Sequence, residues 1–323
     1  MIRQLRQSVL FLTMLSLGLA TATTAQDRDK KDKKAGPITN PILWENVDTA
    51  SLDLFNGPGG TAMRPDISRI EFIKEETQGH NKKFRIKDAK GQIWVAKLGS
   101  EAQPETSAVR LLHGLGYKTE VNYLVPELTI PGKGTHKNVR LEARPENIER
   151  LDEWKWKENP FIGTNELQGL KIMMVFLTNW DLLDLQNKVL RVDNNRTVEH
   201  HFIISDLGAT FGKLGNNNLP FLFRLGRKTN DPGTWYESGF VSKVEDGMID
   251  FDFKGKGRGL MEDISVENGR WIAGRLAMLS DKQLDDAFRA ANYSPDEVKL
   301  LRHGVRERTA ELEKASRTAV EAN

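Results

Sequence analysis

The chain has 323 residues, of which 47 are Lys or Arg and 45 are Asp or Glu, so its formal net charge is only +2. This balance gives no electrostatic reason to bind nucleic acid or an anionic membrane surface. The absence of cysteine from the sequence excludes disulfides, thiolate catalysis and cysteine-held zinc, and it fits an oxidising compartment.

Residues 1–25 have the features of a cleavable signal peptide. Arg3 and Arg6 form a basic start, Val9 to Ala20 is a short apolar run, and Thr23-Thr24-Ala25 offers small residues for cleavage. The apolar run is too short to span a bilayer comfortably. Cleavage after Ala25 would leave about 300 residues, enough for one two-lobed domain. We therefore expect an exported protein, periplasmic or extracellular, with no membrane span after cleavage.

Residues 26–40 read as a charged linker, and residues 41–145 are predicted to form a strand-rich N-lobe. The N-lobe begins with a loop-rich segment that contains Asn56-Gly57-Pro58-Gly59-Gly60. Alternating apolar and polar residues, interrupted by turn-forming segments, then predict five strands with one helix inserted after the third. The strands are Ile70–Lys74, Lys83–Asp88, Gln92–Leu98, Val121–Ile130 and Asn138–Ala143, and the helix is Pro104–Leu115.

Residues 146–323 are predicted to form a mainly helical C-lobe that contains a hairpin. Apolar residues recur at helical spacing from Leu167 to Leu177, which predicts a long helix that ends near Asn179. The hairpin strands are Lys188–Val192 and Val198–Ser205. Three further helices have N-terminal capping signals at Ser265, Ser280 and Ser294. The predicted fold class is therefore α+β, with an antiparallel five-stranded N-lobe.

The order of these elements, from about Arg69 to the C-terminus, resembles the protein-kinase-like fold. Asn179-Trp180-Asp181 follows the long helix, and Asp206-Leu207-Gly208 follows the hairpin, which are the places of the catalytic loop and of the metal-binding segment in kinases. The pattern is similar to that of atypical branches such as HipA-type and CotH-type kinases. It also resembles a bacterial exported family that shares Asn-Trp-Asp and Asp-Leu-Gly-Ala-Thr-Phe-Gly.

The resemblance implies roles for particular residues. Lys97, at the end of the third strand, would hold the α- and β-phosphates of a nucleotide, and Glu105 would pair with it, with Glu101 as the alternative. Asp181 would accept the proton of the attacking hydroxyl, and Asp206 would bind Mg²⁺. These assignments make Lys97 and Asp181 the candidate catalytic residues.

Asn187 is the candidate for a second metal ligand, but the sequence departs here from the kinase pattern. The interval from Asp181 to Asn187 is one residue longer than in kinases, so Gln186 occupies the usual ligand position. Either the loop has an extra residue or Gln186 replaces the ligand, and Asp184 is a further candidate.

A phosphate-covering lid is expected around Gly79, in the segment Thr77 to Asn81 between the first two strands. This segment lacks the repeated glycines of the usual kinase lid, so an ordinary hairpin turn is the favoured interpretation. The glycines from Gly57 to Gly60 are the alternative, although such Gly/Pro clusters usually form turns.

Two other motifs suggest ligands. His200-His201 suggests zinc, but adjacent residues on a strand point to opposite faces, so one site cannot easily use both. Trp154-Lys155-Trp156-Lys157 could bind a glycan or a polyanion, although a packing segment is favoured.

The sequence thus predicts an exported, monomeric kinase-like protein that binds ATP or another nucleotide with Mg²⁺ through Lys97 and Asp206. It would transfer phosphoryl to a hydroxyl of a protein or a small molecule. A non-catalytic pseudokinase or binding protein of the cell envelope, or a nucleotidyl transferase on the same fold, is the alternative.

Overall fold

The computed structural model describes residues 37–77, 81–194, 196–214 and 226–317. The predicted signal peptide and the lid residue Gly79 lie outside the described residues. Among those described, no helix combines the length and the apolar character needed to cross a membrane.

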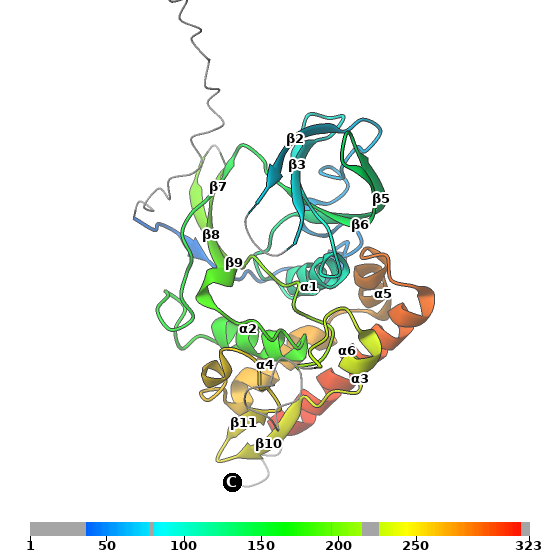
Figure 1. Ribbon diagram of the computed structural model, residues 1–323. Helices are drawn as coiled ribbons and strands as arrows, with labels where there is room; N and C mark the ends of the chain where they lie inside the picture. Colours follow the sequence, from blue (N-terminus) through cyan, green and yellow to red (C-terminus); the bar gives the residue numbers. More distant parts are fainter. Residues whose placement is uncertain (1–36, 78–80, 195, 215–225, 318–323) are drawn as a thin grey trace, which may run out of the picture. The chain divides into compact units, whose positions relative to one another are not determined.

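The N-lobe is a five-stranded antiparallel sheet in the order β2-β3-β4-β6-β5 (Figure 1). Its inward-facing side chains, among them Phe84, Trp94, Tyr123 and Leu141, form a hydrophobic core of their own. In β3 buried and partly exposed residues alternate, as the period of two along a strand requires. The strands are β2 (Glu71–Glu76), β3 (Lys83–Lys87), β4 (Ile93–Lys97), β5 (Asn122–Ile130) and β6 (Gly134–Ala143).

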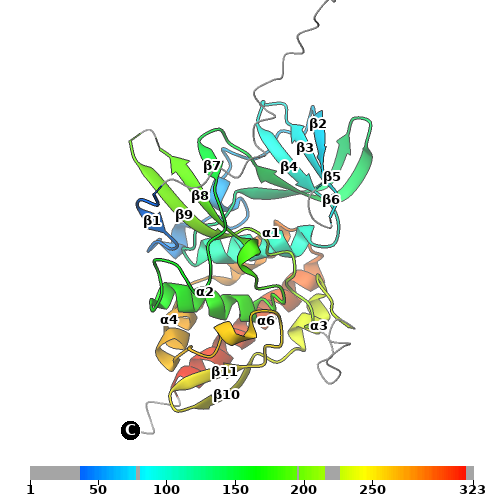
Figure 2. The ribbon, with the colours of Figure 1, turned by 60° about the vertical axis from the view of Figure 1, so that its left-hand side comes forward.

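Helix α1 (Ala102–Gly114) connects β4 to β5 and lies between the sheet and the helices of the C-lobe (Figure 2). It packs against β5 and β6 on one side and against α5 on the other. Its buried residues Ala108, Leu111 and Leu112 belong to the larger hydrophobic core, which continues into the C-lobe. The five strands and the single inserted helix confirm the sequence prediction.

A second sheet has the order β1-β9-β8-β7, with β1 parallel to β9 and the other pairs antiparallel. The sequence predicted the β8–β9 hairpin but neither edge strand, because two or three residues carry no periodicity. Leu43, directly after β1, belongs to the larger core and not to that of the five-stranded sheet. The strands are β1 (Pro41–Ile42), β7 (Ile148–Arg150), β8 (Asn187–Asp193) and β9 (Val198–Ile204).

The C-lobe is built around α2 (Asn165–Phe176), which packs against α4 (Val266–Ala277), while α4 and α5 (Asp281–Arg289) pack against α6 (Pro295–Arg317). The capping interactions predicted at Ser265, Ser280 and Ser294 are present. Elements that the sequence did not predict are α3 (Pro232–Tyr236), the hairpin β10 (Val241–Glu245) and β11 (Met248–Phe251), and 3₁₀ turns at Thr49–Ser51, Gly57–Gly59, Asp184–Gln186 and Arg258–Leu260.

The prediction for β6 was too short at its N-terminal end. The strand was predicted from Asn138, whereas it starts at Gly134 and pairs with β5 from there. Asn138 lies within the strand in the left-handed region, with φ of 49°, so the residue that seemed to begin the strand is an irregularity inside it.

Candidate active site

Lys97 is the last residue of β4, and its side chain is almost completely buried. Its ammonium nitrogen lies 2.8 Å from Glu105 Oε2 and 3.4 Å from Glu101 Oε2, so both candidate partners contact it. Asp206 Oδ1 lies 3.5 Å from the same nitrogen, although it is 109 residues away in the sequence. The structure thus brings together Lys97, Glu105 and Asp206.

The charge on Lys97 is maintained by these carboxylates. Burial alone would lower its pKa, but Glu105, and to a smaller extent Asp206 and Glu101, outweigh burial and raise the pKa above its ordinary value. Lys97 is therefore a fixed cation at neutral pH, which is what a phosphate-binding lysine requires.

Arg140 holds the other side of Glu105, a partner that the sequence gave no reason to choose. Its Nη1 lies 3.0 Å from Glu105 Oε1, and its Nη2 donates to Glu142 Oε2 at 2.8 Å. Glu142 also pairs with Arg150, whose Nη2 donates to the hydroxyl of Ser205 at 2.7 Å. A continuous chain of ion pairs and hydrogen bonds therefore connects Lys97 with the residue that precedes Asp206.

Asp206 follows β9, where the Ser205 N–H donates to the Gln186 carbonyl at 2.7 Å. Asp206 Oδ1 accepts the Gly208 N–H at 3.2 Å, and its side chain is 39% exposed. A Cβ at Gly208 would lie 2.6 Å from the Cβ of Glu101, so only glycine allows this turn to approach the start of α1. The carboxylate is thus held at the solvent-facing side of the buried Lys97.

Asp181 lies on the segment that follows α2, directly beside the Asp206 segment. The Trp180 N–H donates to the Ala209 carbonyl at 3.4 Å, which places the two segments side by side. Asp181 Oδ2 accepts a hydrogen bond from Gln186 Nε2 at 2.9 Å, and Oδ1 lies 2.6 Å from Lys256 Nζ. Both oxygens of the candidate proton acceptor therefore have polar partners.

Asn187 and Gln186 have different surroundings. The Asn187 side chain is fully buried, with Nδ2 donating to the Trp154 carbonyl at 2.9 Å and with Oδ1 accepting no hydrogen bond from any described residue. Gln186 instead orients Asp181, and Asp184 Oδ1 accepts the Trp156 N–H at 3.0 Å. The metal-binding role of Asn187 stays a prediction, for which its Oδ1 is the available ligand atom.

Lys256 is a residue that the sequence reasoning missed. Its N–H donates to the Trp180 carbonyl at 3.0 Å, and it pairs with Asp181 in a parallel bridge. Glycines on both sides permit this approach, because a Cβ at Gly255 would lie 3.0 Å from Trp180 Cα and one at Gly257 would lie 2.7 Å from the Leu182 carbonyl. The alternation of lysine and glycine from Lys254 to Gly257 was the sequence feature that could have indicated this contact.

The glycine cluster and the Trp154–Lys157 motif have structural roles. A Cβ at Gly57 would meet the Arg110 guanidinium at 2.5 Å, and Tyr123 donates to the Gly60 carbonyl at 2.6 Å, so this glycine cluster is a turn packed against α1 and β5. Trp154 and Trp156 are buried with ring centroids 4.9 Å apart, which excludes them as an exposed glycan-binding surface.

No protein-family model matches the sequence. No curated protein matches it significantly either. Among solved structures, the crystal structure of the Helicobacter pylori proinflammatory kinase CtkA matches with a TM-score of 0.50 at 13% identity, over 80% of this chain and 98% of its own. The chain has a protein-kinase-like fold. The fold resemblance predicted from motif order is thereby confirmed, and at this identity the match shows the fold alone.

A second match with the kinase-like fold is the Rio2 kinase from Chaetomium thermophilum, whose structure is an ADP/Mg²⁺-phosphoaspartate complex. It covers 77% of this chain and 74% of its own, with 11% identity and a TM-score of 0.30.

Proposed function

We propose that this chain is an exported kinase-like protein that binds a magnesium nucleotide between its lobes and transfers a phosphoryl group to a hydroxyl acceptor. The observation that carries the proposal is the meeting of Lys97, Glu105 and Asp206, with Lys97 Nζ 2.8 Å from one carboxylate and 3.5 Å from the other. A buried cation aimed at a partly exposed carboxylate is typical of a functional site. From its motifs, we assign the chain to the atypical kinase branches.

The residues present fit a magnesium nucleotide. The described residues contain no group of three or more His, Asp or Glu able to hold a metal ion alone. Mg²⁺ commonly binds through one or two side-chain oxygens together with substrate phosphates, so Asp206 with Asn187 or Gln186 is a sufficient protein contribution. When bound, the ion would neutralise phosphate charge, while Lys97, oriented by Glu105, would contact phosphate oxygens.

Asp181 would take the proton of the attacking hydroxyl. Its carboxylate is only 19% exposed and is held by Gln186 and Lys256, which fixes the direction of its oxygens. A positioned carboxylate beside the Asp206 segment is the arrangement that proton transfer to a general base requires.

Nucleotide binding can be tested by calorimetry with ATP, with and without Mg²⁺. We expect binding by the native protein only with metal, and its loss in Asp206→Ala, because metal-bridged contact to the phosphates then disappears. Asp252→Ala is the matched control, since Asp252 is also a partly exposed carboxylate and pairs with Lys254 at 3.2 Å. Equal binding by the native protein and Asp206→Ala, or no binding with Mg²⁺ or Mn²⁺, would contradict the proposal.

A non-catalytic nucleotide-binding protein is the second candidate, and two contacts favour it. The buried Asn187 uses its amide nitrogen to hold the Trp154 carbonyl, and Gln186, the other candidate for the second metal ligand, donates to Asp181. ATP is also scarce outside the cytoplasm. Nucleotide binding without transfer from [γ-³²P]ATP would support this candidate, and transfer of label only from [α-³²P]ATP would indicate a nucleotidyl transferase.

Export is proposed from residues 1–25 and is tested separately. N-terminal sequencing of the protein purified from its producing cells should find a start near Gln26. A soluble cytoplasmic protein that retains Met1 to Ala25 would contradict export without affecting the nucleotide proposal.

A further inference from the structure

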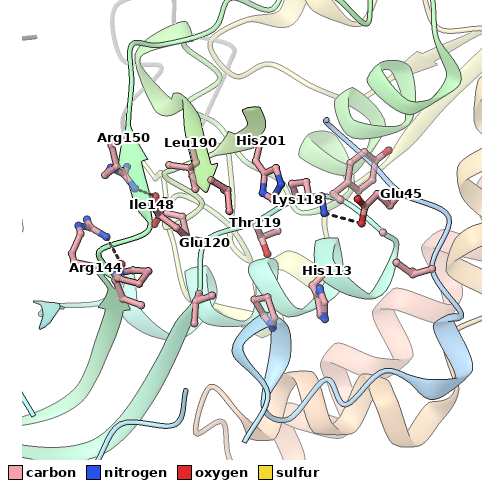
Figure 3. Close-up of a pocket in the computed structure, with 18 residues that line it drawn as sticks. Glu45, His113, Lys118, Thr119, Glu120, Arg144, Ile148, Arg150, Leu190 and His201 are labelled. Carbon is pink, nitrogen blue, oxygen red and sulfur yellow. Dashed lines mark hydrogen bonds and ion pairs between the residues drawn. The ribbon is translucent and has the colours of Figure 1, made fainter. Parts of the chain in front are cut away.

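The candidate metal ligand Asp206 is anchored on its N-terminal side through Ser205. The Ser205 hydroxyl accepts a hydrogen bond from Arg150 Nη2 at 2.7 Å and donates to Glu120 Oε1 at 3.2 Å. Arg150 and Glu120 also form an ion pair, at the wall of a cavity of about 280 Å³ (Figure 3). This side of the Asp206 turn is therefore held by polar groups that already have partners.

The C-terminal side of Asp206 contains a glycine, which introduces conformational freedom. Glycine is required at position 208, because a Cβ there would lie 2.6 Å from the Cβ of Glu101. The Gly208 N–H donates to Asp206 Oδ1 at 3.2 Å, so the direction of the carboxylate depends on the conformation of Gly208. A residue without a Cβ has the widest range of backbone conformations. An ordered metal ligand at this point therefore needs Gly208 to be held by another contact.

The Thr229 hydroxyl supplies this contact from 21 residues further along the chain. Its oxygen lies 2.6 Å from the Gly208 carbonyl and 3.0 Å from the Thr210 carbonyl. The Thr210 carbonyl also accepts the Asn230 N–H at 3.2 Å, whereas no other described residue donates a hydrogen bond to the Gly208 carbonyl. Gly208 is buried, and a buried carbonyl without a partner is costly. The Thr229 hydroxyl is therefore the group that holds Gly208.

Thr229 is itself fixed by a short antiparallel ribbon. Lys213 and Lys228 exchange two backbone hydrogen bonds, of 2.9 Å and 3.0 Å. A Cβ at Gly212 would lie 2.0 Å from the Lys228 carbonyl oxygen, so only glycine permits this close approach. Together with the Asn230 N–H, which follows Thr229, the ribbon holds the backbone on both sides of the hydroxyl.

We propose that Thr229 is a positioning residue for the metal site. Its hydroxyl holds the Gly208 carbonyl, the Gly208 N–H holds the Asp206 carboxylate, and the carboxylate thereby keeps the direction in which it would bind Mg²⁺. No bond forms or breaks. Only the last of these steps rests on the proposed function, because the two hydrogen bonds belong to the protein without nucleotide.

Hydrogen exchange of the Gly208 amide, measured by NMR on the full-length protein without nucleotide, tests whether Thr229 holds the turn. Thr229→Val keeps the shape of the side chain and removes the hydroxyl, so exchange at Gly208 should become about tenfold faster. Thr229→Ser keeps the hydroxyl and should exchange as slowly as the native protein. Thr234→Val is the matched control, since the half-buried Thr234 hydroxyl lies in the same segment but donates to the Asp231 carbonyl at 3.2 Å.

The consequence for the metal is tested by titrating Mg²⁺ at a fixed ATP concentration. Thr229→Val should need about 10- to 100-fold more Mg²⁺ for half-maximal ATP binding, as is typical when a residue that orients a metal ligand is changed. ATP affinity at saturating Mg²⁺ should stay within a few-fold of the native value. A general loss of stability would not produce this difference, and Thr229→Ser should again behave as the native protein does.

Unchanged exchange at Gly208 in Thr229→Val, or equal acceleration in Thr234→Val, would overturn the proposal. An unchanged Mg²⁺ requirement in Thr229→Val would also overturn it. Thr229→Ala removes the same hydroxyl and replaces Thr229→Val if that variant does not fold. If the native protein binds no ATP, the proposed function fails, and exchange at Gly208 still decides whether Thr229 holds the turn.

Discussion

Lys256 follows Asp181 by 75 residues in the sequence, yet its ammonium nitrogen lies 2.6 Å from the Asp181 carboxylate. The contact does not depend on a flexible side chain alone, because the Lys256 N–H also donates to the Trp180 carbonyl at 3.0 Å. Lys256 therefore orients Asp181 and places a positive charge beside the point where we propose phosphoryl transfer.

Lys256→Met should lower phosphoryl transfer by about 10- to 100-fold, because a poorly positioned Asp181 reacts less often from a productive geometry. Nucleotide affinity should stay within a few-fold of the native value. Autophosphorylation with [γ-³²P]ATP measures the first quantity and calorimetry the second. Lys254→Met is the matched control, since Lys254 is on the same segment but pairs with Asp252. Equal phosphoryl transfer by the native protein and Lys256→Met would show that Lys256 does not contribute to the reaction.

Asp181→Asn separates an enzyme from a binding protein. A general base contributes about 10²–10⁴-fold in rate, so the variant should lose transfer visibly while its nucleotide affinity changes little. The amide keeps the shape of the carboxylate, and a thermal unfolding curve that matches the native one would exclude unfolding as the cause. Full transfer by Asp181→Asn would make Asp184 the next residue to test.

Arg140→Met should destabilise the fold by about 3–5 kcal/mol, since it leaves Glu105 and Glu142 buried with fewer cationic partners. Urea unfolding followed by tryptophan fluorescence measures this change. Arg302→Met is the control, because Arg302 pairs with Asp285 at 3.0 Å with both side chains about one-third exposed. Arg302→Met should lower the free energy of unfolding by less than about 1 kcal/mol. Similar losses of unfolding free energy in the two variants would mean that the buried ion pairs stabilise the fold no more than an exposed pair does.

His113 should make the fold less stable in mild acid. Burial, with Arg110 and Lys118 nearby, lowers its pKa to about 4, whereas in the unfolded chain it titrates near 6.5. Between these pH values the unfolded state binds the proton at His113 and the folded state does not. The contribution of His113 to the free energy of unfolding is therefore fully present above pH 6.5 and is lost as the pH decreases toward 4.

Urea midpoints measured from pH 7 to pH 5 test this as a difference between the native protein and a His113 variant, because Glu120, whose pKa burial raises to about 7, and His201, whose pKa burial lowers, contribute equally to both. His113→Gln should flatten the slope by up to one proton. His303→Gln, which replaces an exposed histidine on α6, is the control substitution. An identical slope in the native protein and His113→Gln would contradict the assignment.

The sequence by itself determined the features that depend on near neighbours. Alternation along β3 and β4 predicted strands, and the serines at 265, 280 and 294 predicted helix starts, because side-chain period and capping are properties of a few consecutive residues. The order of these elements was sufficient to predict the kinase-like fold and to select Lys97, Glu105 and Asp206 as a group that the structure then brings together.

The tertiary structure alone decided which distant side chains complete the site. Lys256 pairs with Asp181, and Arg140 pairs with Glu105, across sequence separations that no local pattern spans. Gln186, and not Asn187, faces Asp181, because the two side chains take different directions where the 3₁₀ turn ends and β8 begins. The segment around β1 was read as loop because its two-residue strand forms only against β9. The contacts of Lys256, Arg140 and β1 join segments far apart in the chain, so they exist only once the core has formed. The Gln186–Asp181 contact spans only five residues, but its direction depends on where β8 begins.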